Sequence, residues 1–107
     1  MKESSIILTS LPQSDGSHKL RPVLVLRELP TYNDFLVCGI SAQLHQEIID
    51  FDILLNANQA NGLKANSLVR LSFLAVLSHK DIKNTIGKID ATMHKLLLER
   101  LSNYLTK

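Results

Sequence analysis

Short apolar runs separated by turn residues make up most of the chain. Gly, Pro, Asn and Asp residues between the runs are typical of turns, and such runs favour antiparallel β-strands. Pro22–Leu26 and Phe35–Ile40 are apolar at consecutive positions, so both faces of these strands should be covered. We therefore predict a mainly β fold with strands at Ile6–Leu11, Pro22–Leu26, Phe35–Ile40, Ile48–Leu55, Ser67–Leu71 and Phe73–Leu77, the last two being separate or one bent strand.

The fourth of these runs is followed by a polar segment. We expect Ile48–Leu55 to be a short edge strand with Asp50 and Asp52 facing outward, because charged residues are common on exposed strand edges. Asn56–Asn66 contains several asparagines and a glycine, which predict a surface loop.

Helical signals are confined to the C-terminal part of the chain. Ser78 with Asp81 is a variant of the capping box and predicts a short helical turn, and Gly87–Ile89 should be a brief extended link. Asp90 is a suitable N-cap for a final helix that lies across the core and closes it. Its apolar face should hold Met93, Leu96, Leu97, Leu101, Tyr104 and Leu105, and its other face His94, Lys95, Glu99 and Arg100.

Length and composition indicate an ordinary globular protein. The chain has 107 residues, of which 45% are hydrophobic and 21% charged, so we expect one domain, residues 1–107. No apolar run approaches the roughly 20 residues that span a bilayer, and Ile6–Leu8 is too short for a secretory signal. Cys38 is the only cysteine, which predicts a buried, inert thiol and a cytoplasmic location.

Charge is distributed unevenly along the chain. Residues 1–60 hold four basic and seven acidic residues, whereas residues 61–107 hold eight basic and three acidic ones. A basic half suits a polyanion or an acidic protein partner, although the default for dispersed lysines is a solvated face.

One arginine and one serine stand out as candidate functional residues. If Pro22–Leu26 and Phe35–Ile40 are adjacent antiparallel strands, then Arg21 and Ser41 lie close together at one edge of the sheet. A guanidinium beside a hydroxyl suits a phosphate; the alternative is a solvated arginine and a strand-end serine. The sequence offers no metal-ligand spacing and no glycine-rich phosphate loop, since its histidines are scattered at His18, His45, His79 and His94.

The segments around these residues contain recognisable motifs. Lys19–Leu26 carries an Arg-Pro pair that opens an apolar strand, and Ile40–Gln43 reads Ile-Ser-Ala-Gln. In their order and spacing the segments resemble the MazF/PemK (Kid) toxins of bacterial toxin–antitoxin modules, in which threonine replaces that serine. The similarity covers nearly the whole chain and includes Ser5–Gly16, Gly62–Leu63, Ser67–Arg70 and Leu74–Ile82.

This resemblance implies both a fold and an activity. The expected fold is an SH3-like antiparallel β-barrel with a C-terminal helix, working as a homodimer. The expected activity is that of an mRNA interferase, a cytoplasmic endoribonuclease that needs no metal or other cofactor. In this reaction the ribose 2′-OH of single-stranded RNA attacks the adjacent phosphate. The expected protein partner is a cognate antitoxin, whose acidic tail should cover the edge that holds Arg21 and Ser41.

The resemblance also assigns roles to individual residues. Arg21 matches the family's catalytic arginine and Ser41 its catalytic threonine, while Arg70 matches an arginine that we interpret as an electrostatic stabiliser. Gln43 should contact RNA, and the loop before the Arg-Pro strand presents His18 and Lys19.

Position 72 departs from the family pattern. The Kid branch has an aspartate there that acts as base, whereas this chain has Ser72, which cannot act as a base unaided and is assigned to RNA contact. His18 is an alternative base, or simply a solvated histidine. The departure keeps open a second hypothesis, a non-catalytic relative that binds antitoxin or RNA. A gyrase poison of the CcdB kind is disfavoured, because the chain has no tryptophan and lacks the Trp-Gly-Ile tail.

Overall fold

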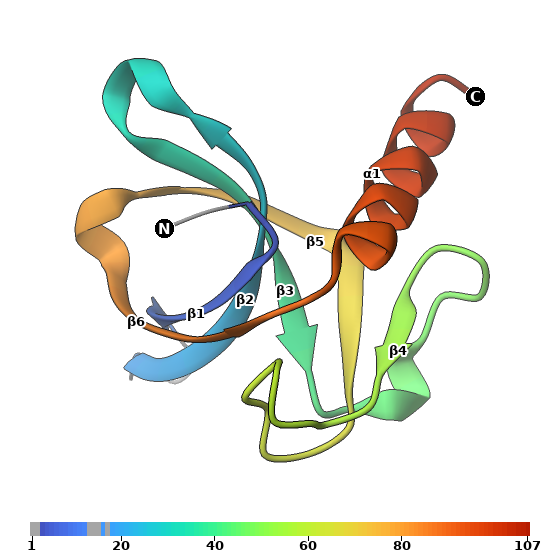
Figure 1. Ribbon diagram of the computed structural model, residues 1–107, viewed down its shortest axis with the longest axis horizontal. Helices are drawn as coiled ribbons and strands as arrows, with labels where there is room; N and C mark the ends of the chain where they lie inside the picture. The colour runs from blue at the N-terminus through green and yellow to red at the C-terminus, as the bar shows by residue number, and fades with distance from the viewer. Residues whose placement is uncertain (1–2, 13–15, 17) are drawn as a thin grey trace.

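The fold is one antiparallel sheet with a single α-helix beside it. A computed structural model describes residues 3–12, 16 and 18–107, and Figure 1 shows the arrangement. The six strands follow the spatial order β4-β5-β3-β2-β1-β6. Their bounds, with those of the helix, are β1 Ser5–Pro12, β2 His18–Leu29, β3 Asp34–Ser41, β4 Ile53–Leu55, β5 Ser67–Ser78, β6 Ile82–Lys88 and α1 Ala91–Leu105.

Most of the predicted strands are confirmed, with two differences. Ser67–Leu71 and Phe73–Leu77 form one strand, β5, which is one of the two arrangements expected. The predicted edge strand Ile48–Leu55 is reduced to the short β4. The expected link at Gly87–Ile89 is wrong, because β6 is a full edge strand that pairs with β1. Lys83, Asn84 and Thr85 of β6 are exposed, so the strand lacks the apolar pattern by which the others were recognised. The turn capped by Ser78 is confirmed as a 3-10 helix, His79–Asp81.

Alternate residues of the central strands build apolar clusters on both faces of the sheet. In β2, Leu24 and Leu26 belong to the main cluster and Val23 and Val25 to a smaller one, as the two-residue period of a strand requires. The main cluster also holds Ile6, Cys38, Ile40, Ile53, Leu55, Val69, Leu71, Ile89, Leu97 and Leu101. The smaller cluster adds Ile7 and Val37, so the prediction that the central strands are covered on both faces is confirmed.

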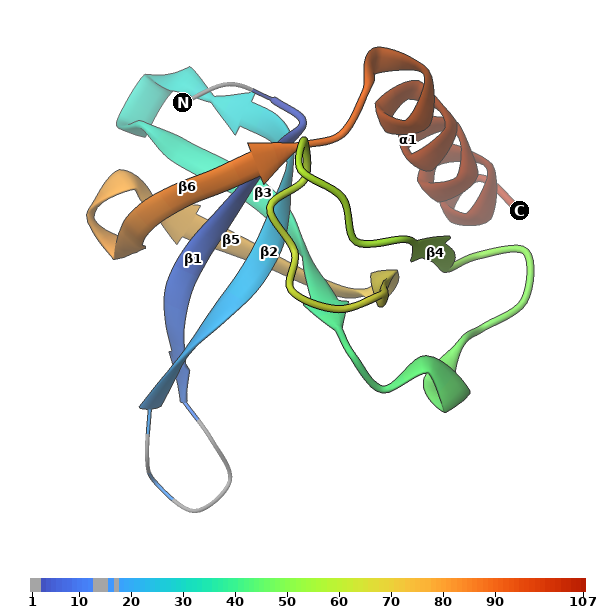
Figure 2. The ribbon, with the colours of Figure 1, turned by 60° about the horizontal axis from the view of Figure 1, so that its bottom comes forward.

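Helix α1 uses only part of its apolar face against this core. Asp90 accepts the backbone N–H of Met93 at 2.7 Å, as a predicted N-cap should. Leu97 and Leu101 are buried, whereas Leu96, Tyr104 and Leu105 remain exposed, because the helix passes beside the sheet and does not lie across it (Figures 1 and 2). No helix in the described part of the chain is long and apolar enough to cross a membrane.

The helix face opposite the apolar one also makes contacts. His94 donates from Nε2 to the carbonyl of Leu26 at 2.8 Å. Arg100 donates from Nη1 to the carbonyl of Asp52 at 3.1 Å. Both side chains are half-buried, so this face of the helix is only partly exposed. Each of these side chains gives a hydrogen-bond donor to a backbone carbonyl that the helix covers.

The sheet is open, unlike the closed barrel that the family resemblance implied. Strands β4 and β6 form its two edges, and the predicted loop Asn56–Asn66 lies between them (Figure 2). The backbone N–H of Lys88 donates to the carbonyl of Ala60 at 3.0 Å. A Cβ on Gly62 would lie 2.0 Å from the carbonyl oxygen of Ile86. The loop therefore approaches β6 so closely that only glycine fits at position 62.

This contact can be tested by substituting two glycines that share a backbone conformation. Gly62 has φ +69° and is crowded, whereas Gly16 has φ +87° and a Cβ added there would meet nothing within 4 Å. Gly16→Ala should cost about 1–2 kcal/mol of unfolding free energy for its left-handed backbone, and Gly62→Ala about 2–5 kcal/mol because overpacking adds to it. Urea unfolding measures both; equal losses would show that the loop does not press against β6.

Candidate active site

A bulge in β5 shapes the region around two of the candidate residues, Arg70 and Ser72. Cys38 of β3 pairs with Leu74, but the next residue, Gly39, pairs with Arg70. The stretch Leu71–Phe73 therefore has no partner in β3, and its backbone must find other hydrogen bonds.

The side chain of Asp52 supplies one of these bonds. Its Oδ1 accepts the backbone N–H of Leu71 at 3.1 Å, and its Oδ2 accepts the N–H of Ile48 at 3.0 Å. The side chain is fully buried, so the predicted outward orientation of Asp52 was wrong. The reason is that Asp52 precedes β4 and turns towards the unpaired part of β5, where a backbone donor needs an acceptor.

The guanidinium of Arg70 lies above this carboxylate. Its Nε is 3.9 Å from Oδ2 of Asp52, Nη1 donates to Oε1 of Gln46 at 3.2 Å, and Nη2 donates to Oγ of Ser72 at 3.3 Å. The side chain is 28% exposed. Arg70 is thus held by protein groups while part of its surface still faces solvent.

The strand register places the three predicted catalytic residues on one face of the sheet. Val23 pairs with Gly39 in the β2–β3 ladder, and Arg70 pairs with Gly39 from the other side. Arg21 lies two residues before Val23, and Ser41 lies two residues after Gly39. Because side chains alternate with a period of two, all three share the face of the smaller apolar cluster.

Arg21 and Ser41 occupy the same end of neighbouring strands, but these strands separate there. The β2–β3 ladder begins at Val23, so both residues lie beyond it. Arg21 instead pairs with Thr9 of β1, and Ser41 pairs with Leu68 of β5. Figure 2 shows β2 and β3 diverging towards this end. The two residues therefore flank an opening in the sheet.

The hydroxyl of Ser41 can still donate a hydrogen bond at this opening. Its Oγ accepts the backbone N–H of Gln43 at 3.1 Å, and a hydroxyl that accepts one bond can still donate its own hydrogen. Gln43 is exposed and directly precedes the 3-10 helix Leu44–Gln46, which carries the Arg70 partner Gln46.

The remaining candidates lie on the β1–β2 hairpin. His18 pairs with Pro12 at the start of β2, and Lys19 pairs with Leu11. Lys19 is exposed, whereas the side chain of His18 lies outside the described part of the structure. Among the described residues, no group of three or more His, Cys, Asp or Glu side chains could hold a metal ion.

Sequence reasoning missed two members of the site, Asp52 and Gln46. A hint was available for Asp52, which stands as a charged residue between Phe51 and Ile53. Its partner is far away in the sequence, and the bulge that creates the need for an acceptor cannot be read from residue types. No sequence pattern around Gln46 indicated a role in the site.

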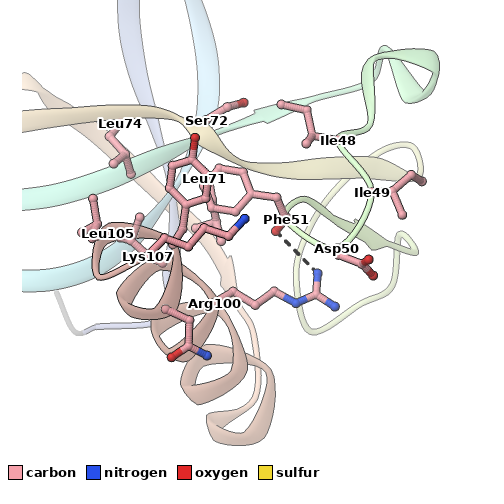
Figure 3. Close-up of a pocket in the computed structure, with 13 residues that line it drawn as sticks. Ile48, Ile49, Asp50, Phe51, Leu71, Ser72, Leu74, Arg100, Leu105 and Lys107 are labelled. Atoms are coloured by element: carbon pink, nitrogen blue, oxygen red, sulfur yellow. Dashed lines mark hydrogen bonds between the residues drawn. The ribbon is translucent and has the colours of Figure 1, made fainter.

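A pocket of about 640 Å³ lies next to the bulge, and the bulge residues Leu71 and Ser72 are part of its lining. It is enclosed by the C-terminal half of α1, by β5 and by the segment Ile48–Phe51, as Figure 3 shows. Most of its lining is apolar, including Leu74 and Leu105, and charged groups are present at Asp50, Arg100 and Lys107.

Comparison with known proteins decides the family. A sequence profile of the PemK-like, MazF-like toxins of type II toxin–antitoxin systems matches residues 2–105. The chain belongs to this family. A search of curated proteins finds no match.

Solved structures show the MazF-like fold independently. The Mycobacterium tuberculosis toxin MazF-mt6 is 24% identical, with a TM-score of 0.74 over 95% of this chain and 96% of that one. An endoribonuclease in complex with its cognate antitoxin, from a mycobacterial species, is 9% identical, with a TM-score of 0.73 over 99% and 95% of the two chains. A further Mtb toxin is 24% identical, with a TM-score of 0.64 over 78% and 90%.

In this MazF-like chain Cys38 is a core residue, as the sequence predicted. The side chain is fully buried. Burial, followed by the negative charge of Asp52, raises the pKa of the Cys38 thiol to about 12. The folded protein therefore keeps the thiol protonated at pH values where the unfolded chain ionises, and Cys38 is not a nucleophile.

Alkylation with iodoacetamide tests this state of Cys38. At pH 9 the native protein should react about 10²–10³-fold more slowly than the chain unfolded in urea, because the thiolate is the reacting form. Comparable rates in the two states would contradict a buried thiol with a raised pKa.

Proposed function

We propose that this chain is a metal-independent endoribonuclease, the mRNA interferase toxin of a type II toxin–antitoxin module. The observation that carries the proposal is the common face shared by Arg21, Ser41 and Arg70 at the open end of the sheet, in a member of this toxin family. One of the mycobacterial neighbours is itself described as an endoribonuclease. A toxin of this kind acts on mRNA in the cytoplasm.

The reaction would use the RNA's own 2′-OH as nucleophile. A bond forms between the 2′-oxygen and phosphorus, and the bond from phosphorus to the 5′-oxygen breaks. The products are a 2′,3′-cyclic phosphate and a 5′-OH. The 2′-OH loses a proton to a base, and the 5′-oxygen gains one from an acid.

The site residues suit the charge that develops in this reaction. The phosphorane carries more negative charge than the starting phosphodiester, so fixed cations stabilise it selectively. Arg21 is exposed and would bind the phosphate, while Arg70 adds a second positive charge. Ser41 would donate its hydrogen to a phosphate oxygen. Lys19 and Gln43 would contact the neighbouring nucleotides.

Ser72 has a different part in this scheme. Its Oγ accepts a hydrogen bond from Nη2 of Arg70 at 3.3 Å, so it helps to orient the guanidinium near the bound RNA. A serine in this arrangement does not replace the aspartate of the Kid branch as a base. His18, the alternative base suggested by the sequence, starts β2 three residues before Arg21. This odd spacing does not put it on the face shared by Arg21, Ser41 and Arg70, so we assign no residue as the base.

Ser72 also supports the second candidate function. A MazF-like chain without a competent base would bind its antitoxin or RNA without cleaving it. The two functions differ in one result, the cleavage of single-stranded RNA in the presence of EDTA by protein freed of antitoxin.

We further propose that the chain works as a homodimer. Around the 640 Å³ pocket, β5 and α1 expose large apolar side chains, among them Leu74, Tyr104 and Leu105. Exposed apolar surface of this kind marks an interaction site. Asp50 and Lys107 line the same pocket, so a two-fold copy can place opposite charges against each other. The cognate antitoxin would be a separate partner. That its acidic tail covers Arg21 and Ser41 stays a prediction.

Substitution of two arginines on β2 tests the catalytic assignment. Arg21→Ala should slow cleavage of a mixed-sequence RNA in EDTA by about 100- to 1,000-fold, because a phosphorane-stabilising donor is lost. Arg27→Ala is the matched control: Arg27 is exposed on the same strand and pairs with Glu3 at 3.0 Å. Its cleavage rate should stay within about twofold of the wild-type rate. Unchanged cleavage by Arg21→Ala would remove Arg21 from the site.

Light scattering tests the dimer and its surface. The wild type should give the mass of two chains at micromolar concentration, and Leu105→Glu should give one, because a carboxylate would be buried in an apolar contact. Leu105 is 70% exposed in the single chain, so folding should tolerate the change. Tyr32→Glu, at an 80% exposed side chain outside the pocket, should remain dimeric. A wild-type monomer would refute the proposal, and a dimeric Leu105→Glu would place the interface elsewhere.

A further inference from the structure

We propose that Asp52 positions Arg70 for the phosphate and supplies, from another part of the chain, the negative charge that position 72 lacks. This inference rests on the proposed ribonuclease function. It assigns a role to a residue that does not touch RNA and that the sequence pattern had placed on the surface.

The first argument is the state of the carboxylate. The side chain of Asp52 is 0% exposed, and its two oxygens accept the backbone N–H groups of Leu71 and Ile48. These bonds fix the orientation of the carboxylate. A buried carboxylate also needs a nearby positive charge, and Arg70 is the cation that lies against it.

The second argument is the geometry of the ion pair. Nε of Arg70 is 3.9 Å from Oδ2 of Asp52, which is too long for a hydrogen bond. The Nη atoms donate to the neutral oxygens of Gln46 and Ser72. Asp52 thus attracts the guanidinium without forming the bidentate pair that would occupy it. Arg70 keeps positive charge and exposed surface for a phosphate.

The third argument is the connection between Asp52 and the loop before β4. Oδ2 of Asp52 accepts the N–H of Ile48, and Gln46, which holds Nη1 of Arg70, lies in the same loop. Arg100 of α1 donates to the backbone carbonyl of Asp52 at 3.1 Å. Loss of the Asp52 carboxylate would therefore release Arg70 directly and, through the loop, loosen Gln46.

The burial of Asp52 excludes a different role. A general base must reach the 2′-OH directly or through one water. The side chain of Asp52 has no exposed surface, and both its oxygens already accept backbone N–H groups. Asp52 is therefore a positioning residue and not the base that Ser72 fails to provide.

The kinetic test compares two acidic residues, one buried beside Arg70 and one exposed elsewhere. Asp52→Asn keeps an oxygen for the N–H of Leu71 but removes the charge. It should lower kcat about 10- to 100-fold and change KM less than about threefold, since the lost interaction matters most in the transition state. Glu28→Gln removes the same charge from an exposed side chain on β2 that lies outside both the candidate site and the pocket. Its kinetics should match the wild type.

A double variant shows whether Asp52 acts through Arg70. If it does, Asp52→Asn combined with Arg70→Gln should cleave no more slowly than Arg70→Gln alone. A further loss as large as in the wild-type background would overturn the proposal, as would an equal loss in Glu28→Gln. Asn61→Ala controls for stability, because it deletes a buried side chain that hydrogen-bonds only within its own loop in the described structure.

A second readout does not need RNA cleavage. Nε of Arg70 is buried, so its N–H should exchange slowly with water and give a resolved NMR signal. Asp52→Asn should speed the exchange at least about 10-fold, while Glu28→Gln and Asn61→Ala should not. An unchanged signal in Asp52→Asn would overturn the positioning role. A wild type that cleaves no RNA but shows these exchange differences would refute the ribonuclease function and leave the Asp52–Arg70 link standing.

Discussion

The arrangement of the candidate active site depends on one constraint, the buried carboxylate of Asp52. An isolated buried carboxylate is costly, so the backbone N–H groups of Leu71 and Ile48 and the guanidinium of Arg70 must stay in place around it. Arg100 attaches α1 to the same residue through its backbone carbonyl. The bulge in β5, the loop before β4 and the helix are thereby fixed relative to one another.

Because side chains alternate along each strand, the two faces of the sheet carry different clusters. Leu24 and Leu26 build the main core with α1, while Val23 and Val25 build a smaller cluster on the opposite face. The small cluster covers less of its face, and at its end β2 and β3 separate. Arg21 lies at this end, so the polar groups proposed for catalysis occupy the part of the face that the apolar residues leave open.

The sequence predicted those features that depend on local patterns. The central strands, the Ser78 turn and the N-cap at Asp90 each follow from residues close together in the chain. Features that depend on distant partners were not predictable: the polar edge strand β6 is held by pairing with β1, and Asp52 is buried because the bulge in β5 leaves the N–H of Leu71 unpaired. Arg21 and Ser41 were first singled out by the strand pattern. The family resemblance gave them and Arg70 catalytic roles, and these roles are proposals.

The central claim is that RNA is cut by its own 2′-OH without a metal ion. The most direct test incubates antitoxin-free protein, in EDTA, with a single-stranded RNA that it cuts and with the same RNA carrying a 2′-O-methyl group at the cut nucleotide. The account predicts fragments ending in a 2′,3′-cyclic phosphate and a 5′-OH from the first RNA, and no cleavage at that site in the second. Cleavage of the methylated site, fragments with 5′-phosphate ends, or no cleavage of any RNA by folded protein would contradict it.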